Sequence, residues 1–433
     1  MATSITTQTL ADTISQNHAV LVDVRPSAAY NGWALRGEKR GGHIPGSVSF
    51  PVQWFELFDE ETIKKILSEK GFFSENIILT GYPDDLDRAA SGFNRFGLDA
   101  VQVHEKGTPD WASQEDRPLR FLPRYRHLVH VEWLEQLLNG ENPDKTDMKP
   151  YVLAHVNFDN WGDYDEGHIP GAIWLDTLCL ESERTWNRHP AGELEQELAD
   201  LGITRDTMVV LYGRTANPNM SQDHPGKQAG QLASMRAAMI LMYAGVQDVR
   251  VLDGGLDSWL RAGHSITHEE VEPRSVSATG LDIPEHPEYI VDTPEAKDLI
   301  AGSDSELVSM RSWEEYIGNV SGYHYVGPKG RIKGAVFGNN GSDAYHMENY
   351  RNHDDTMHSF HEIEANWKQM GITPDKRIAF YCGTGWRASE AFFCAWLMGW
   401  PNVAVYDGGW FEWSSDPENP VESGIPENHS GPK

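Results

Sequence analysis

One stretch decides the fold of this chain: Phe380-Tyr381-Cys382-Gly383-Thr384-Gly385-Trp386-Arg387-Ala388-Ser389. The residues leading into it, 377–381, are mostly apolar and predict a short buried strand. The residues that follow, 388–399, are mostly helix formers and apolar residues, and they predict a helix. The stretch therefore predicts a strand, a tight glycine-containing loop and a helix that begins where the loop ends.

The predicted loop is suited to hold an anion. Backbone N–H groups at a helix N-terminus point into such a loop, and the helix dipole adds partial positive charge there. Gly383 and Gly385 permit backbone angles that a side chain would forbid, and Arg387 adds a full charge. These surroundings favour a thiolate, which makes Cys382 a candidate nucleophile. A lone cysteine commonly packs in a core, but a core position needs no Gly-x-Gly and arginine directly after it.

The strand, the loop from Cys382 to Arg387 and the following helix resemble the active-site loop of rhodaneses. These sulfurtransferases pass sulfane sulfur through a cysteine persulfide. The resemblance implies that Cys382 is the catalytic residue. It implies further that the rest of the loop binds the substrate, namely Gly383, Thr384, Gly385, Trp386 and Arg387. No cofactor is expected.

The length of the loop separates two chemistries. Dual-specificity phosphatases with the same fold have a Cys-x5-Arg loop, whose wider cradle holds a tetrahedral phosphate. Here Cys382 and Arg387 are spaced as Cys-x4-Arg. The shorter loop forms a tighter ring of amides around the sulfur and suits a persulfide better. Sulfur transfer is therefore ranked above phosphatase activity.

A five-residue motif recurs along the chain. Gly-His-Ile-Pro-Gly occupies residues 42–46 and 167–171, and the weaker Gly-Arg-Ile-Lys-Gly occupies residues 330–334. Each copy follows an apolar, strand-like segment. A second motif, Asp-Gly-Gly with a tryptophan four positions after its second glycine, occupies residues 253–259 and 407–413. An internal repeat of this kind indicates one domain for each copy.

The repeat predicts the architecture. Strands that alternate with helices indicate α/β domains, each built on a mostly parallel sheet flanked by helices. A chain of 433 residues accommodates about three domains of ordinary size. We therefore expect three tandem rhodanese-like domains over residues 1–120, 121–272 and 273–433.

Only the third copy keeps the cysteine. Gly81 and Gly213 follow the central strands of the first two copies, at the place of Cys382. These two domains therefore resemble the inactive domains of tandem rhodaneses, and the third domain is expected to be catalytic. A polar insert, residues 215–228, follows Gly213 and is interpreted as a solvated loop.

A second cation is expected near the cysteine. In tandem rhodaneses the strand before the Gly-His-Ile motif usually ends in Asp-x-Arg, and the arginine helps to bind the anionic donor. This chain has Ser309-Met310-Arg311, so Arg311 is a candidate substrate-binding residue, whereas Ser309 departs from the pattern. Because the net charge is −29, an anionic donor needs local positive charge. We expect a basic patch of Arg311, Lys329, Arg331, Lys333 and Arg387.

The implied mechanism is ping-pong transfer. The Cys382 thiolate attacks the outer sulfur of a small-molecule donor, and cyanide or a thiol then takes the sulfur from the persulfide. Thiosulfate is the first expected donor. Mercaptopyruvate is the second, because Cys-Gly-Thr-Gly is similar to the loop start of mercaptopyruvate sulfurtransferases. An alternative of another class is a persulfide relay or scaffold that delivers sulfur to a partner, such as a sulfur-carrier protein.

Composition excludes several other classes. The charge of −29 argues against nucleic acid and anionic membranes as partners. Three cysteines exclude a disulfide framework, and Cys179 and Cys394 are expected in cores. Four histidines between residues 346 and 361 match no standard zinc spacing, so no metal is predicted. Without an apolar run of ~20 residues or a signal-peptide pattern, the chain as written is expected in the cytoplasm, or in the periplasm if a signal was removed.

Overall fold

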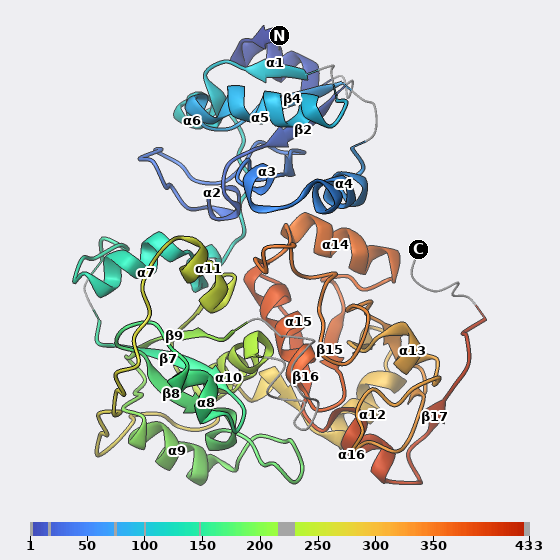
Figure 1. Ribbon diagram of the computed structural model, residues 1–433. Helices are drawn as coiled ribbons and strands as arrows, with labels where there is room; N and C mark the ends of the chain where they lie inside the picture. The colour runs from blue at the N-terminus through green and yellow to red at the C-terminus, as the bar shows by residue number, and fades with distance from the viewer. Residues whose placement is uncertain are drawn as a thin grey trace. The chain divides into compact units, whose positions relative to one another are not determined.

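The computed structural model describes residues 3–15, 19–72, 76–98, 101–146, 149–214 and 230–427. The chain divides into two compact units, residues 1–125 and residues 126–433 (Figure 1). The first unit contains one five-stranded sheet and the second unit contains two. The polar insert at residues 215–228 lies outside the described residues.

All three sheets are parallel and have the same strand order. The first sheet has the order β1 (Thr3–Ile5), β5 (Val101–His104), β4 (Ile77–Thr80), β2 (Val20–Asp23), β3 (Val48–Ser49). The second has the order β6 (Leu128–Val129), β10 (Asp248–Leu252), β9 (Met208–Tyr212), β7 (Tyr151–Asn157), β8 (Ile173–Asp176). The third has the order β11 (Ile290–Val291), β16 (Val403–Tyr406), β15 (Arg377–Tyr381), β12 (Ser305–Ser309), β14 (Val336–Phe337). An antiparallel pair, β13 (Arg331–Ile332) and β17 (Val421–Glu422), accompanies the third sheet. The prediction of three mostly parallel α/β domains is confirmed.

Helices connect the strands in each domain. The first domain has α1 (Thr7–Ser15), α2 (Ser27–Asn31), α3 (Trp54–Leu57), α4 (Glu60–Glu69), α5 (Pro83–Arg95) and α6 (Gly107–Ser113). The second has α7 (Val131–Leu138), α8 (Trp161–Asp165), α9 (Ala191–Asp200), α10 (Gly230–Ala244) and α11 (Gly255–Arg261). The third has α12 (Thr293–Ala301), α13 (Trp313–Tyr316), α14 (Phe360–Gln369), α15 (Trp386–Leu397) and α16 (Gly409–Ser415). Short 3-10 turns are η1 (Tyr125–His127), η2 (Thr177–Cys179) and η4 (Pro287–Tyr289).

The elements around Cys382 are close to those predicted. The expected strand at 377–381 is β15, whose last four residues are all buried, as in a parallel sheet covered on both faces. The expected helix at 388–399 begins earlier, at Trp386. The reason is Gly385, which takes a left-handed φ of 91° and turns the chain into the helix at once.

The second and third domains share a helical interface. Helices α10 and α15 pack against each other (Figure 1), and every residue of α10 is buried. A helix that is apolar on all sides must be covered on all sides, which explains why α10 lies between its own sheet and α15. The N-terminus of α15, where the Cys382 loop ends, is thereby held against the second domain.

Candidate active site

The loop after β15 is fixed by α16, the helix that begins in the Asp-Gly-Gly motif. The carbonyls of Cys382 and Gly383 accept the N–H groups of Trp410 at 2.8 Å and Phe411 at 3.0 Å. A Cβ atom at Gly409 would lie 2.7 Å from the Gly383 carbonyl oxygen, and Gly409 has a φ of 54°. The motif therefore needs glycine there, because only glycine lets α16 approach the loop so closely.

Cys382 lies at the start of this loop and exposes 0% of its surface. Gly385 caps α15, and its carbonyl accepts both the N–H and the hydroxyl of Ser389 at 2.9 and 2.8 Å. The twelve-residue α15 thus begins three residues after Gly383. The positive end of its dipole lies at the cysteine loop, as the sequence predicted.

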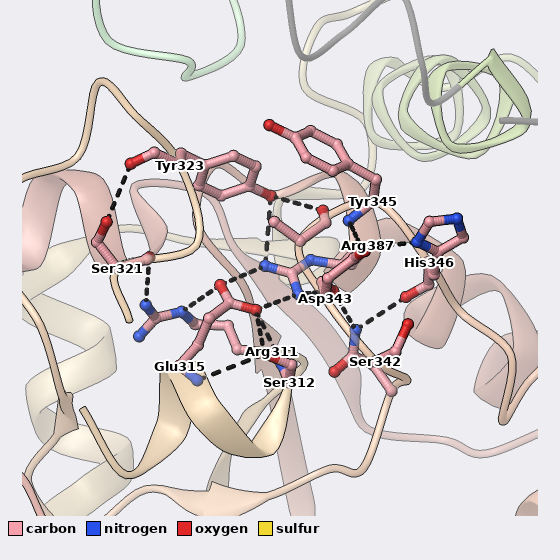
Figure 2. A network of polar contacts seen from close by, with 12 residues as sticks. Arg311, Ser312, Glu315, Ser321, Tyr323, Ser342, Asp343, Tyr345, His346 and Arg387 are labelled. Carbon is pink, nitrogen blue, oxygen red and sulfur yellow. Dashed lines mark hydrogen bonds and ion pairs between the residues drawn. The ribbon is translucent and has the colours of Figure 1, made fainter. Parts of the chain in front are cut away.

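Arg311 and Arg387 meet at one carboxylate, that of Glu315 (Figure 2). Arg387 donates to both Glu315 oxygens, at 2.9 and 3.0 Å, and Arg311 Nε donates to Oε1 at 3.1 Å. All three side chains are fully buried. Burial raises the pKa of Glu315, but the Arg387 and Arg311 charges outweigh it and lower that pKa to about 2. The group therefore carries one net positive charge beside Cys382.

Sequence reasoning identified both arginines but missed Glu315. A local signal for it exists: Ser312 and Glu315 form a capping box at the start of α13, with the Ser312 N–H donating to Glu315 Oε2 at 2.9 Å. The arginines also bind main-chain carbonyls, Arg311 that of Gly330 at 2.6 Å and Arg387 that of Asp343 at 3.0 Å. Their guanidinium groups thus tie four segments of the third domain together.

The expected basic surface patch is not formed by its five residues. Arg311, Arg331 and Arg387 are buried, and only Lys329 and Lys333 are exposed. Arg331 donates to the Gly424 carbonyl at 2.8 Å. A buried guanidinium group needs hydrogen-bond partners. Backbone carbonyls and carboxylates inside the domain accept from these three arginines, which therefore lie in the interior and not at the surface.

Two tyrosines lie against the loop. A Cβ atom at Gly383 would be 2.0 Å from Cε2 of Tyr323, so this ring rests on the residue next to Cys382. The Tyr323 hydroxyl donates to the Ala344 carbonyl at 3.1 Å and lies 3.3 Å from Arg387 Nη2 (Figure 2). Tyr325 stacks on Tyr323, with the ring centroids 5.3 Å apart. Burial raises the pKa of both tyrosines, so both remain proton donors at neutral pH.

The second domain supplies a buried network to the same loop. The Trp386 indole donates to Glu181 Oε1 at 2.8 Å. Arg236 of α10 binds Glu181 at 2.7 Å and Asp407 at 2.7 Å. Burial raises the pKa of Glu181 to about 7, with Arg236 opposing the shift, whereas Arg236 and Arg188 overcome burial and lower the pKa of Asp407. Glu181 therefore titrates near neutral pH, whereas Asp407 stays charged there.

The positions equivalent to Cys382 in the other two domains are glycines that are closely packed. Gly81 follows β4 and Gly213 follows β9, the strands equivalent to β15 in each sheet. A Cβ atom would lie 2.6 Å from Val24 Cγ2 at Gly81 and 2.0 Å from the Gly230 carbonyl oxygen at Gly213. Both positions are closed to any side chain.

The remaining expectations concern the other thiols and the surface. Cys394 is buried and Cys179 is half-buried; burial raises the pKa of both thiols, that of Cys179 to about 12. Within the described ranges, no group of three or more His, Cys, Asp or Glu side chains is placed to hold a metal. No helix in that part of the chain is long and apolar enough to cross a bilayer.

Comparison with known families and proteins gives a consistent result. Residues 6–114, 130–262 and 292–416 each match the Rhodanese-like domain. The chain is 39% identical over 420 residues to thiosulfate sulfurtransferase YnjE of Escherichia coli (strain K12), covering 95% of this chain and 91% of that protein. It is 28% identical over 314 residues to sulfur carrier protein TtuD of Thermus thermophilus, covering 69% of this chain and 96% of that protein.

Solved structures of a further relative are also similar. The anaerobic ergothioneine biosynthesis enzyme from Chlorobium limicola, in complex with its natural substrate trimethyl histidine, is 48% identical, with a TM-score of 0.95 over 98% of this chain and 100% of that one. A structure of EanB with ergothioneine covalently linked to a cysteine persulfide is 48% identical, with a TM-score of 0.96 over 99% and 100% of the two chains. Other EanB structures carry a substitution of a tyrosine or of a threonine.

Proposed function

The chain belongs to the rhodanese-like sulfurtransferases, and on that premise we propose that its Cys382 persulfide transfers sulfur to the imidazole ring of trimethyl histidine, forming ergothioneine. Cys382 is the catalytic residue of this proposal. Thr384, Tyr323 and the loop amides contact the reacting groups, and Arg311 and Arg387 supply the fixed positive charge. The first and second domains are catalytically silent.

The arrangement of Tyr323, Cys382 and Thr384 carries this proposal. In EanB, the substituted tyrosine precedes the persulfide cysteine by the same number of residues as Tyr323 precedes Cys382 here. The substituted threonine follows that cysteine by two positions, as Thr384 follows Cys382. In this structure the Tyr323 ring rests on Gly383, the residue after Cys382. The Tyr323 ring and Thr384 therefore lie close to Cys382 along the loop, at the positions of the two residues that are substituted in EanB.

The reaction balances without an added oxidant. In the first step the Cys382 thiolate attacks the outer sulfur of the donor: an S–S bond to Cys382 forms, the bond between that sulfur and the rest of the donor breaks, and thiosulfate leaves as sulfite. In the second step a C–S bond forms between the outer sulfur and the imidazole carbon, while the S–S bond and the C–H bond break. The inner sulfur departs as the Cys382 thiolate and the released proton restores the thiol, so the carbon is oxidised and the sulfane sulfur is reduced. The loop amides, the α15 dipole and the net charge of the Arg311–Glu315–Arg387 group stabilise that leaving thiolate.

A second candidate is sulfur transfer from thiosulfate to cyanide or a thiol. The 39% identity to YnjE over 95% of the chain favours it. Thiosulfate remains the first proposed donor for either acceptor, and mercaptopyruvate the second. The sulfur-relay alternative is supported by the similarity to TtuD, a sulfur carrier protein.

These functions can be distinguished by offering the loaded protein different acceptors. The protein is incubated with thiosulfate, mercaptopyruvate or a polysulfide, and each loaded sample is offered trimethyl histidine, cyanide or a thiol. We expect ergothioneine to form with wild type and not with Cys382→Ala. Transfer to cyanide and thiols alone would favour the second candidate. A persulfide that reacts with none of them would indicate a protein acceptor.

A further inference from the structure

Trp186, in the second domain, stacks on Tyr325. Tyr325 stacks in turn on Tyr323, whose ring rests on Gly383 next to Cys382. We infer that Trp186 and Tyr325 together form the binding site for the quaternary ammonium group of the acceptor. This inference rests on the proposed function, in which trimethyl histidine is the acceptor. A domain without a nucleophile of its own thereby determines which acceptor the third domain uses.

Trp186 lies in a short hairpin between η2 and α9, where Glu181 and Arg188 form a β-bridge. Its ring centroid is 5.6 Å from that of Tyr325, with the two planes 27° apart, and 5.2 Å from that of Phe158. Both Trp186 and Tyr325 are half-buried. Each side chain therefore keeps part of its surface exposed, although Tyr325 also stacks on Tyr323.

The hairpin is fixed firmly to the third domain. The Arg188 N–H donates to Asp407 Oδ2 at 2.9 Å, and the Asn187 amide donates to Glu412 Oε2 at 2.7 Å. The Trp186 carbonyl accepts from Arg236 at 2.9 Å. The same Arg236 binds Asp407, at the start of the Asp-Gly-Gly motif. These bonds fix the position of the Trp186 indole relative to the Cys382 loop.

The backbone of Trp186 is strained, with a φ of 61°. A bulky residue avoids this left-handed region, and such outliers cluster at functional sites because surrounding bonds must enforce them. Holding a bulky side chain in this conformation costs folding free energy. The packing of the second domain gains little from a half-exposed ring, so a role in binding accounts for the cost.

The third domain contains a matching hairpin that serves as an internal control. There the Met357 N–H donates to Asp253 Oδ1 at 2.7 Å, as the Arg188 N–H does to Asp407. The residue two positions earlier, Asp355, has a φ of 64°, as Trp186 has 61°. Aspartate tolerates this conformation far better than tryptophan. The ring is therefore present only in the hairpin that faces Cys382.

The ligand chemistry follows from the rings. A quaternary ammonium group has no N–H to donate, and it binds instead to the faces of Trp and Tyr rings within about 6 Å of the centroid. Tyr323 stacks on Tyr325 at 5.3 Å, and Tyr325 lies 6.4 Å from Phe411. The aromatic wall thus runs from Gly383 to Trp186. An acceptor with its imidazole at Cys382 places its ammonium group along this wall.

The test uses full-length Trp186→Asn and Trp186→Tyr, with Trp161→Asn as the matched control, because Trp161 is an exposed tryptophan of the same domain. Persulfide yield is measured by intact mass, and KM and kcat are measured with trimethyl histidine. Calorimetry with tetramethylammonium measures the ammonium site alone. We expect Trp186→Asn to keep its persulfide yield and fold, since asparagine suits the left-handed conformation. Its KM and its Kd for tetramethylammonium should both rise about tenfold, while Trp186→Tyr and Trp161→Asn stay near wild type.

Equal tetramethylammonium affinity in wild type and Trp186→Asn would overturn the inference. A KM that rises equally for trimethyl histidine and for unmethylated histidine would overturn it as well. Failure of the wild-type persulfide to react with trimethyl histidine would instead refute the proposed acceptor. In that case, loss of tetramethylammonium binding in Trp186→Asn would still establish the ammonium site.

Discussion

Glu315 sets the charge around Cys382. Two buried guanidinium groups would repel each other and be costly to desolvate, and the carboxylate between them removes one of the two charges. Under the proposed mechanism, the single positive charge that remains stabilises the departing sulfur. The exposure of Glu315 is 0%, so this balance is not screened by water.

Replacing Glu315 by glutamine leaves two cations buried without a partner charge. Breaking a buried ion pair in this way costs about 3–5 kcal/mol, so we expect the urea midpoint of Glu315→Gln to fall well below that of wild type. The control is Glu314→Gln, at the exposed neighbouring position. Equal midpoints for the two variants would contradict the role given to Glu315.

The sequence identifies those site residues that lie close together along the chain. Cys382, its glycines and Arg387 lie in one short stretch, and both the strand and the helix beside them carry ordinary propensity signals. Glu315 bonds to Arg387 across 72 positions, and nothing in the sequence near either residue specifies that pairing. For the same reason the expected basic patch was wrong: sequence gives the charge of Arg331 but not the backbone carbonyls that bury it.

At the scale of elements, the site depends on how closely α16 approaches the loop after β15. The predicted strand, loop and helix are confirmed, and the Asp-Gly-Gly repeat was visible in the sequence. The structure explains why the second glycine of the motif is needed: Gly409 lies against the Gly383 carbonyl. A repeated motif can therefore be recognised before the contact that it serves is known.

Gly409→Ala tests that contact. The added methyl group would meet the Gly383 carbonyl oxygen at 2.7 Å, at a residue whose φ is 54°. We expect the hydrogen bonds from Trp410 and Phe411 to the loop to be lost and the yield of Cys382 persulfide to fall about tenfold or more. Intact mass after donor treatment measures it. Gly192→Ala is the control, because no atom lies within 4 Å of its added Cβ; equal yields in both variants would refute the argument.

At the scale of the whole molecule, the second domain contributes side chains to the surroundings of the Cys382 loop. Glu181 binds Trp386 at the end of the Cys382 loop, Arg236 binds Asp407 of the Asp-Gly-Gly motif, and Trp186 stacks on Tyr325. The sequence predicted that this domain is inactive but not what it contributes. Contacts such as Glu181 to Trp386 join segments 205 positions apart, and only the packing of α10 on α15 brings them together.

The pKa of Glu181 also predicts how the free energy of unfolding varies with pH. Its folded pKa of about 7 lies above the value of about 4.3 for an unfolded glutamate. The native state therefore binds the proton more tightly, and this contribution to stability is complete below about pH 4.3 and is lost as pH rises through 7. We expect the urea midpoint of wild type to fall between pH 5 and pH 8.

Glu181→Gln should flatten this dependence, because its amide oxygen can still accept from Trp386 without titrating. Asp253, whose pKa burial raises to about 7, contributes a similar slope and remains in this variant. The measurement is the urea midpoint of both proteins across that pH range. Parallel curves for wild type and Glu181→Gln would show that Glu181 does not hold a proton in the fold.

The most direct test of the proposed reaction is a single turnover. Wild type is loaded with one sulfur atom on Cys382, freed of donor, and mixed with trimethyl histidine, while intact mass and ergothioneine are followed together. The account predicts that the persulfide disappears at the rate at which ergothioneine forms, in equal amounts. A persulfide that survives trimethyl histidine but is discharged by cyanide would contradict it.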